Sequence, residues 1–138
     1  MNTFIYRIFI DTNAKKLWDA LTMPEWTRRY WDGFSIRSEW RVGSDVTLMK
    51  PDGTLNWKGE ILASNRSERL SYTFDPSVDG NYVGETVSKV SWKFERLHNL
   101  LLLTLTHEAL SDTMAGHVAI GWPLIVSRLK TALEAPSI

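Results

Sequence analysis

Hydrophobic and polar residues follow the two-residue period of strands through much of this chain, and the last segment follows the period of a helix. Residues 3–10 (TFIYRIFI) are rich in β-branched and aromatic types, which predicts a strand. Polar residues 11–13 then offer helix caps, and apolar residues at helical spacing predict a helix over 14–22. A second short helix is expected over 24–31, because Pro24 suits the first turn of a helix.

The middle of the chain predicts a run of antiparallel strands separated by turns. Pro51-Asp52-Gly53 has the composition of a tight turn, and His98-Asn99 predicts a hairpin tip. Alternation gives these strands one apolar face, which must be covered. The strands are expected at 34–37, 46–50, 57–64, 69–75, 85–96 and 100–108, and the inward residues include Trp57, Gly59 and Ile61, then Leu70, Tyr72 and Phe74, then Val90, Trp92 and Phe94, and finally Leu101, Leu103, Leu105 and His107.

The last segment changes to a helical period. Its apolar residues form a stripe at i, i+4 and i+7 that consists of Met114, Val118, Trp122, Ile125, Leu129 and Leu133. A helix over 113–134 would span roughly 33 Å at about 1.5 Å per residue, long enough to cross a sheet. The pattern predicts one α+β domain over 1–138: a curved antiparallel sheet that grips a long C-terminal helix, with two short helices after the first strand.

Gly121-Trp122-Pro123 interrupts this helix with two poor helix formers. Interior Gly and Pro together cost about 4 kcal/mol of helix propensity. Either the straight helix begins at Pro123, or a kinked helix continues through it. We favour the kinked helix, because the apolar stripe is already in phase before Trp122. In either case Gly121 is expected to allow close approach to the sheet, and a change of direction would leave room beneath the helix.

Composition narrows the class of protein. The chain has 138 residues, 43% of them hydrophobic, and seven tryptophans, more than a minimal core needs. Sixteen basic residues balance sixteen acidic ones, which disfavours nucleic-acid binding. The absence of cysteine excludes disulfides and thiol chemistry. Neither a membrane span nor a signal peptide is visible, so a soluble, cytoplasmic protein is expected.

Two histidines near the C-terminal end are the main candidates for chemistry. His107-Glu108 and His117 do not have the spacing of a helical zinc motif, because His107 falls on a strand ten residues earlier. His107 has inward parity, so burial would favour its neutral form, and it could act as an acid or base. Catalysis usually needs an orienting partner, and the sequence fixes none, so a pocket histidine that hydrogen-bonds a ligand or a neighbour is preferred. Neither a serine-nucleophile motif nor a nucleotide motif occurs, so no metal, no cofactor and no catalytic residue is predicted.

Three stretches in this order resemble one known family. They are RIFIDTNAKKLWDALTMPEW at 7–26, LTLTHEAL at 103–110 and GWPLIVSRLKTALE at 121–134. The chain resembles the helix-grip superfamily of START and birch-pollen-allergen-like domains, and within it the family named after the activator of a heat-shock chaperone ATPase. Asp11-Thr12 stands where the family commonly has Ala-Pro. Chaperone-stimulating members also carry a further N-terminal domain and an Asn-rich, Trp-containing motif that this sequence lacks, so chaperone activation is not expected.

The resemblance implies an apolar cavity between the sheet and the long helix. We therefore expect a binding module for a small hydrophobic or aromatic molecule, with no nucleic-acid or membrane partner, as a monomer or weak homodimer. A cofactor-free enzyme of the aromatic cyclase or hydrolase type and a chaperone-associated interaction domain are the alternatives, since a fold alone does not choose a function. The expected ligand-binding residues are Trp31, Trp40, Trp57, Tyr72, Trp92, Leu103, His107, Met114, Val118 and Trp122.

Overall fold

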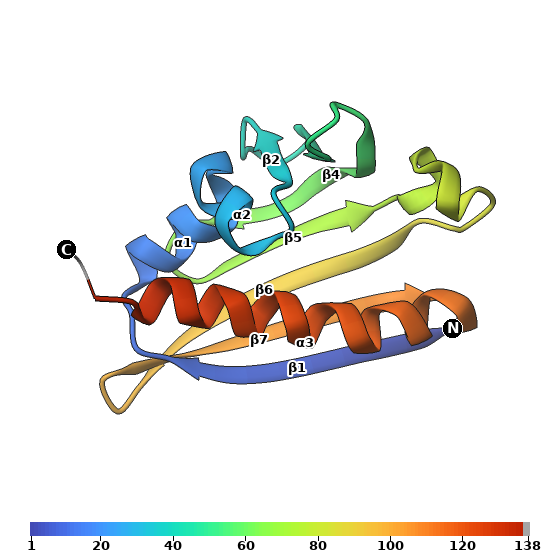
Figure 1. Cartoon of the computed structure of the whole chain (residues 1–138). Helices are drawn as coiled ribbons and strands as arrows, with labels where there is room; N and C mark the ends of the chain where they lie inside the picture. Colours follow the sequence, from blue (N-terminus) through green and yellow to red (C-terminus); the bar gives the residue numbers. More distant parts are fainter. Residues whose placement is uncertain (137–138) are drawn as a thin grey trace.

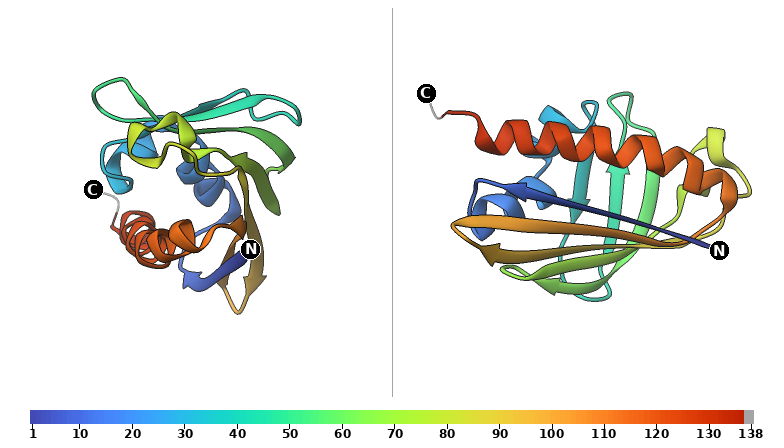
Figure 2. Two further views of the ribbon diagram at one scale, coloured as in Figure 1. Left: turned by 90° about the vertical axis from the view of Figure 1, so that its right-hand side faces the viewer. Right: turned by 90° about the horizontal axis from the view of Figure 1, so that it is seen from below.

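Strand β1 (Asn2–Ile10) forms one edge of a seven-stranded antiparallel sheet with the order β1-β7-β6-β5-β4-β3-β2. The computed structural model describes residues 1–136. The other strands are β2 (Ser35–Ser38), β3 (Asp45–Met49), β4 (Leu55–Asn65), β5 (Arg69–Phe74), β6 (Ser88–Leu97) and β7 (Leu100–Leu110). The sheet curves around helix α3 (Asp112–Glu134), as Figures 1 and 2 show. This confirms the expected helix-grip architecture.

The two short helices form where the cap chemistry predicts them. In α1 (Ala14–Thr22), the Asn13 side chain accepts a hydrogen bond from the backbone N–H of Lys16 at 2.8 Å. Helix α2 (Pro24–Tyr30) begins at Pro24. Proline has no backbone N–H, and this costs nothing in the first turn of a helix, where the N–H groups have no intrahelical acceptor. Both helices lie with α3 inside the curve of the sheet (Figure 2).

Alternation correctly identifies the covered face of the sheet. On β7, Leu101, Leu103, Leu105 and His107 are all buried. The hairpin tip at His98-Asn99 is also confirmed, because Leu97 pairs with Leu100 and both tip residues have positive φ.

Several expected boundaries were wrong. Residues 85–87 are not part of β6, which begins at Ser88. Strand β7 continues past its expected end to Leu110, through an irregularity in its pairing with β1 at which Ala109 has φ 61°. The expected loop 76–84 contains two short 3₁₀ turns, η1 (Pro76–Val78) and η2 (Gly80–Tyr82), and these lie at one end of the sheet.

Helix α3 is continuous through Pro123, so the alternative prediction of a helix that begins at Pro123 is wrong. Its buried residues are Met114, Val118, Trp122, Val126, Leu129 and Leu133. Val126, four residues after Trp122, holds the core position expected for Ile125, which is only half-buried. Within residues 1–136, no helix is both long and apolar enough to cross a membrane.

Gly59 allows β4 to pass very close to β5. A Cβ atom added to Gly59 would lie 1.8 Å from the backbone oxygen of Thr73, closer than any side chain tolerates. The Thr73 hydroxyl accepts a hydrogen bond from the next backbone N–H, that of Glu60, at 2.8 Å. Only glycine fits at this close approach of the two backbones, which places the first part of β4 against the end of β5.

Candidate functional site

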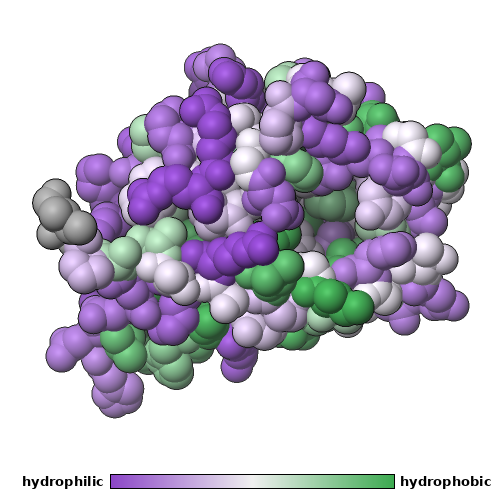
Figure 3. Space-filling model, in the orientation of Figure 1, coloured by the Kyte–Doolittle hydropathy of each residue, from purple (hydrophilic) through white to green (hydrophobic). Residues whose placement is uncertain are grey.

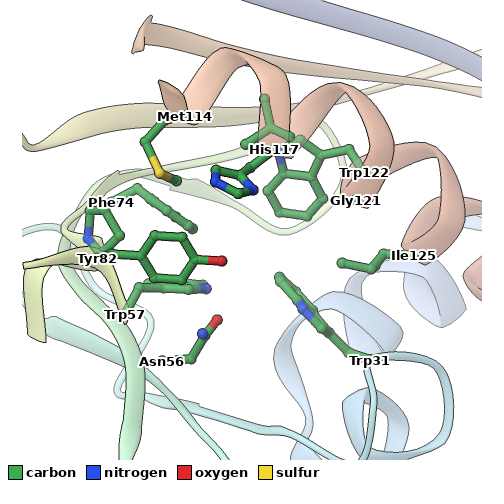
Figure 4. Close-up of a pocket in the computed structure, with 12 residues that line it drawn as sticks. Trp31, Asn56, Trp57, Phe74, Tyr82, Met114, His117, Gly121, Trp122 and Ile125 are labelled. Carbon is green, nitrogen blue, oxygen red and sulfur yellow. The ribbon is translucent and has the colours of Figure 1, made fainter. Parts of the chain in front are cut away.

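A cavity of about 150 Å³ lies between the first half of α3, strands β4 and β5, and the two 3₁₀ turns. Figure 3 shows the surface hollowed above this part of α3, and Figure 4 shows the residues around the space. Its lining combines buried aromatic residues with a more exposed rim. The lining residues are Trp31, Asn56, Trp57, Phe74, Pro76, Tyr82, Met114, His117, Val118, Gly121, Trp122 and Ile125.

Helix α3 supplies one wall through a single stripe. Its six lining residues fall at i, i+3, i+4, i+7, i+8 and i+11 from Met114, the spacing of one helix face. Gly121 lies in the middle of this stripe, and a Cβ atom added there would meet no atom within 4 Å. The expectation that Gly121 allows close packing on the sheet is therefore wrong. The absent side chain leaves open space beside the cavity.

Buried aromatic rings form the floor of the cavity. The ring centroids of Trp31 and Trp122 are 5.3 Å apart in an edge-to-face arrangement. Those of Trp57 and Phe74 are 4.9 Å apart, and Trp57 stacks on Tyr72 at 5.1 Å. Rings packed on one another in this way hold each other in place, so the floor is a rigid apolar surface.

A β-bulge brings two consecutive residues of β4 to the same cavity. Leu48 of β3 pairs with Trp57, and the next residue, Met49, pairs with Leu55, so Asn56 is the extra residue. In a regular strand Asn56 and Trp57 would point to opposite faces. A bulge re-aims the side chain at the extra residue, and here both side chains line the cavity.

Asp79 holds the polar end of this wall. Its carboxylate is 3% exposed, lies 2.8 Å from Nζ of Lys50, and accepts hydrogen bonds from the Asn81 backbone and from Nδ2 of Asn56. The hydrogen bond from Lys50, followed by that from the Asn81 backbone, lowers the pKa of Asp79. The ionised carboxylate thereby orients the Asn56 amide, with Nδ2 turned toward Asp79.

The structure brings five of the ten expected ligand-binding residues to the cavity. Trp31, Trp57, Met114, Val118 and Trp122 line it.

Three further expected residues lie behind this lining. Tyr72 and Trp92 are buried and are joined by a hydrogen bond from Trp92 Nε1 to the Tyr72 hydroxyl at 3.0 Å. Burial raises the pKa of Tyr72, so its phenol stays neutral. Leu103 is buried in β7. Tyr72 and Trp92 support the floor through ring contacts with Trp57 and Trp122, and none of the three residues lines the cavity.

Trp40 does not line this cavity. It is half-buried in the connection between β2 and β3, where its carbonyl accepts a hydrogen bond from Oγ of Ser64 at 2.7 Å. Its backbone N–H donates to Oγ of Ser38, and its φ is 59°. These bonds hold Trp40 at a different part of the surface from the 150 Å³ cavity.

His107 also lies behind the lining, with no exposed surface. Trp122 Nε1 donates to His107 Nδ1 at 3.0 Å, and an indole N–H can only donate. The proton of the neutral ring is therefore on Nε2, 2.7 Å from Ser88 Oγ, which donates onward to the Phe74 carbonyl oxygen. Burial lowers the pKa of His107 to about 4. Both ring nitrogens are bonded to neighbours, so neither is free for a ligand in this structure.

The expected list lacked seven lining residues. His117, Gly121 and Ile125 lie three or four positions from expected residues of α3, so a wider helical stripe would have identified them. Phe74 shares its parity with Tyr72. No pattern in the sequence identifies Asn56, Pro76 and Tyr82 as lining residues, because the bulge and the two 3₁₀ turns that position them depend on long-range pairing. Within residues 1–136, no group of three or more His, Cys, Asp and Glu side chains is placed to hold a metal ion.

Comparison with known proteins places this geometry in a family. The chain is similar in structure to CalU16 from Micromonospora echinospora, at 24% identity over 98% of this chain and 76% of that chain, with a TM-score of 0.79. Protein MLL2253 from Mesorhizobium loti gives 21% identity, 99% and 100% coverage, and a TM-score of 0.80. The Aha1 dimer from Colwellia psychrerythraea gives 22% identity, 97% coverage of both chains, and a TM-score of 0.76.

These likenesses establish the shared fold. No curated protein matches the sequence. A family model, described as Activator of Hsp90 ATPase homolog 1-like protein, matches residues 11–134, which include every residue that lines the cavity. The chain therefore belongs to the Activator of Hsp90 ATPase homolog 1-like protein family.

Proposed function

We propose that this protein binds a small apolar or aromatic molecule in the cavity beneath α3. The observation that carries the proposal is the open space beside Gly121, in the middle of a helix face that is otherwise occupied by side chains. A helix that served only to cover the sheet would gain stability from a larger residue there, both in helix propensity and in buried area.

The size of the space sets the size of the ligand. Apolar cavities of about 150 Å³ admit a molecule the size of benzene, and this cavity has that volume. Burial of about 150 Å² of ligand surface at about 25 cal/mol per Å² contributes about 4 kcal/mol, the free energy of a dissociation constant near 1 mM. We therefore propose a ligand with a single ring, bound at millimolar concentration.

The polar groups around the cavity favour binding over acid–base catalysis. His107, the expected acid or base, lies behind the lining with both nitrogens bonded to neighbours. The lining contains no Asp, Glu, Lys or Arg, and its two titratable side chains are Tyr82 and His117 at the rim. A pocket with an apolar floor and a few polar groups is typical of a ligand site.

Tryptophan fluorescence tests this proposal, because Trp31, Trp57 and Trp122 line the cavity. Titration with toluene, fluorobenzene and chlorobenzene, with excitation at the red edge of the tryptophan band where these compounds do not absorb, should give saturable changes in emission. A folded protein with no saturable response to any single-ring compound would contradict the proposal.

A further inference from the structure

The indole N–H of Trp57 is a buried donor without an acceptor. Trp57 is 1% exposed, and among residues 1–136 its Nε1 has no hydrogen-bond partner. Figure 4 shows this nitrogen on the side of the ring that faces the cavity. Buried polar groups are almost always paired, and an unpaired one costs the full desolvation penalty. The nitrogen itself has almost no accessible surface, so an acceptor in the cavity reaches it after a small shift of the surrounding side chains and then removes that penalty.

The side chain of Asn56 adds an acceptor next to this donor. Because Nδ2 of Asn56 donates to Asp79 at 3.1 Å, the amide oxygen is the group left for the cavity. Asn56 and Trp57 both line the cavity from β4, and Figure 4 shows the Asn56 amide oxygen turned toward the space. The β-bulge that makes Asn56 an extra residue is the reason that two sequence neighbours present a donor and an acceptor together.

The charges around this pair exclude an ionic ligand. The nearest cationic group of the polar wall, Nζ of Lys50, is already paired with Asp79 at 2.8 Å. The lining contains no Asp, Glu, Lys or Arg, and its one imidazole, that of His117, lies on α3 and not on β4 beside Asn56 and Trp57. An ion buried without a partner is strongly disfavoured. The protein offers a donor, Trp57 Nε1, and an acceptor, Asn56 Oδ1. The ligand that complements both is neutral and carries its own acceptor and its own donor.

We propose that the cavity selects a neutral, single-ring aromatic molecule with an amide-type edge, whose carbonyl oxygen accepts from Trp57 Nε1 and whose N–H donates to Asn56 Oδ1. This inference rests on the proposed function, because it assigns a chemical class to the ligand of the same cavity. The aromatic ring of the ligand packs on the apolar floor, and the amide edge lies against β4.

Four probes of nearly equal shape test the two contacts separately. Benzamide offers both an acceptor and a donor, acetophenone offers the acceptor alone, α-methylstyrene offers neither, and benzoate carries a charge. Affinities are measured by NMR titration on the parent protein, Trp57→Phe and Asn56→Leu. Each neutral probe is compared with itself across the proteins, so differences in the hydrophobicity of the neutral probes cancel, and benzoate is compared with benzamide on the parent protein.

We expect Trp57→Phe to weaken benzamide and acetophenone about five- to tenfold, as the loss of one hydrogen bond does, and to change α-methylstyrene less than twofold. Asn56→Leu should weaken benzamide by a similar factor and leave acetophenone within twofold. Benzoate should bind the parent at least tenfold more weakly than benzamide. Equal losses for all neutral probes in both variants would overturn the inference.

The parent protein alone provides a second readout if either variant fails to fold. The indole N–H resonance of Trp57 should move downfield with benzamide and acetophenone and stay in place with α-methylstyrene. If α-methylstyrene binds in the cavity and the carbonyl probes leave that resonance unchanged, the inference fails while the proposed function stands. If no probe binds, both fail.

Discussion

The indole N–H of Trp122 donates a hydrogen bond to Nδ1 of His107 across 3.0 Å, and this bond ties the middle of α3 to β7. Trp122 also packs edge-to-face on Trp92 at 5.5 Å and on Trp31 at 5.3 Å. One side chain therefore joins the long helix to the sheet and to the segment after α2. The same side chain lines the cavity, so the stability of the fold and the shape of the site depend on it.

Trp122→Ala should destabilise the protein by about 3–5 kcal/mol, the usual cost of truncating a large buried aromatic residue. Trp122→Phe should cost about 1–3 kcal/mol, because it leaves Nδ1 of His107 buried without a donor. Urea unfolding measures both losses. Trp26→Phe on α2 is a control at a half-buried tryptophan and should cost less than about 1 kcal/mol. A Trp122→Ala protein as stable as the parent would contradict the role of Trp122 as the helix anchor.

Stability should fall between pH 6.5 and pH 4 because of His107. Burial lowers its pKa from 6.5 to about 4, so the unfolded chain binds the proton more readily throughout this range. Above pH 6.5 both states are neutral and the effect is absent; below pH 4 it is complete, at about 3 kcal/mol. Protonation places a hydrogen on Nδ1, directly against the N–H of Trp122.

Urea unfolding of the parent and of His107→Gln from pH 4 to pH 8 checks this dependence. The difference in free energy of unfolding between the two proteins should shrink as the pH falls from 6.5 to 4. His98 and His117 remain in both proteins and cancel in the comparison. A difference that stays constant across this range would show that His107 is not buried as a neutral ring.

Gly59→Ala should destabilise the protein by about 3 kcal/mol, near the upper end of the range for overpacking. The added Cβ would lie 1.8 Å from the backbone oxygen of Thr73, so β4 and β5 would have to separate. Gly80→Ala is the matched control, since a Cβ there meets no atom within 4 Å. Thermal unfolding should give a large decrease in Tm for the first variant and a small change for the second. Equal changes would argue against a close crossing at Gly59.

The sequence pattern was sufficient for the sheet and the helix that covers it. The strict alternation from Leu101 to His107 correctly placed His107 inside, and the i, i+4 stripe from Met114 to Trp122 correctly placed the first half of α3. These patterns work because each depends on a local period and on one buried face.

The cavity wall was harder to predict, because it depends on exceptions to those periods. Asn56 reaches the cavity through a bulge whose position follows from pairing with β3. Tyr82 reaches it from a 3₁₀ turn that the polar composition of its loop does not reveal. Gly121 was interpreted as a close contact, whereas the structure has open space there. Sequence periodicity identifies what is buried, but not where side chains fail to fill the interior.

The most direct test of the cavity as a binding site fills it with a side chain. Gly121→Leu places an apolar group in the open space of the lining, and Gly116→Leu makes the same change on the same helix at an exposed position outside it. Both variants should be as stable as the parent or more stable by up to about 1 kcal/mol, since leucine favours helix over glycine. NMR titration with toluene then measures the dissociation constant of each protein. We expect Gly121→Leu to weaken binding at least tenfold and Gly116→Leu to leave it within twofold; a Gly121→Leu protein that binds toluene as tightly as the parent would contradict a ligand site beneath α3.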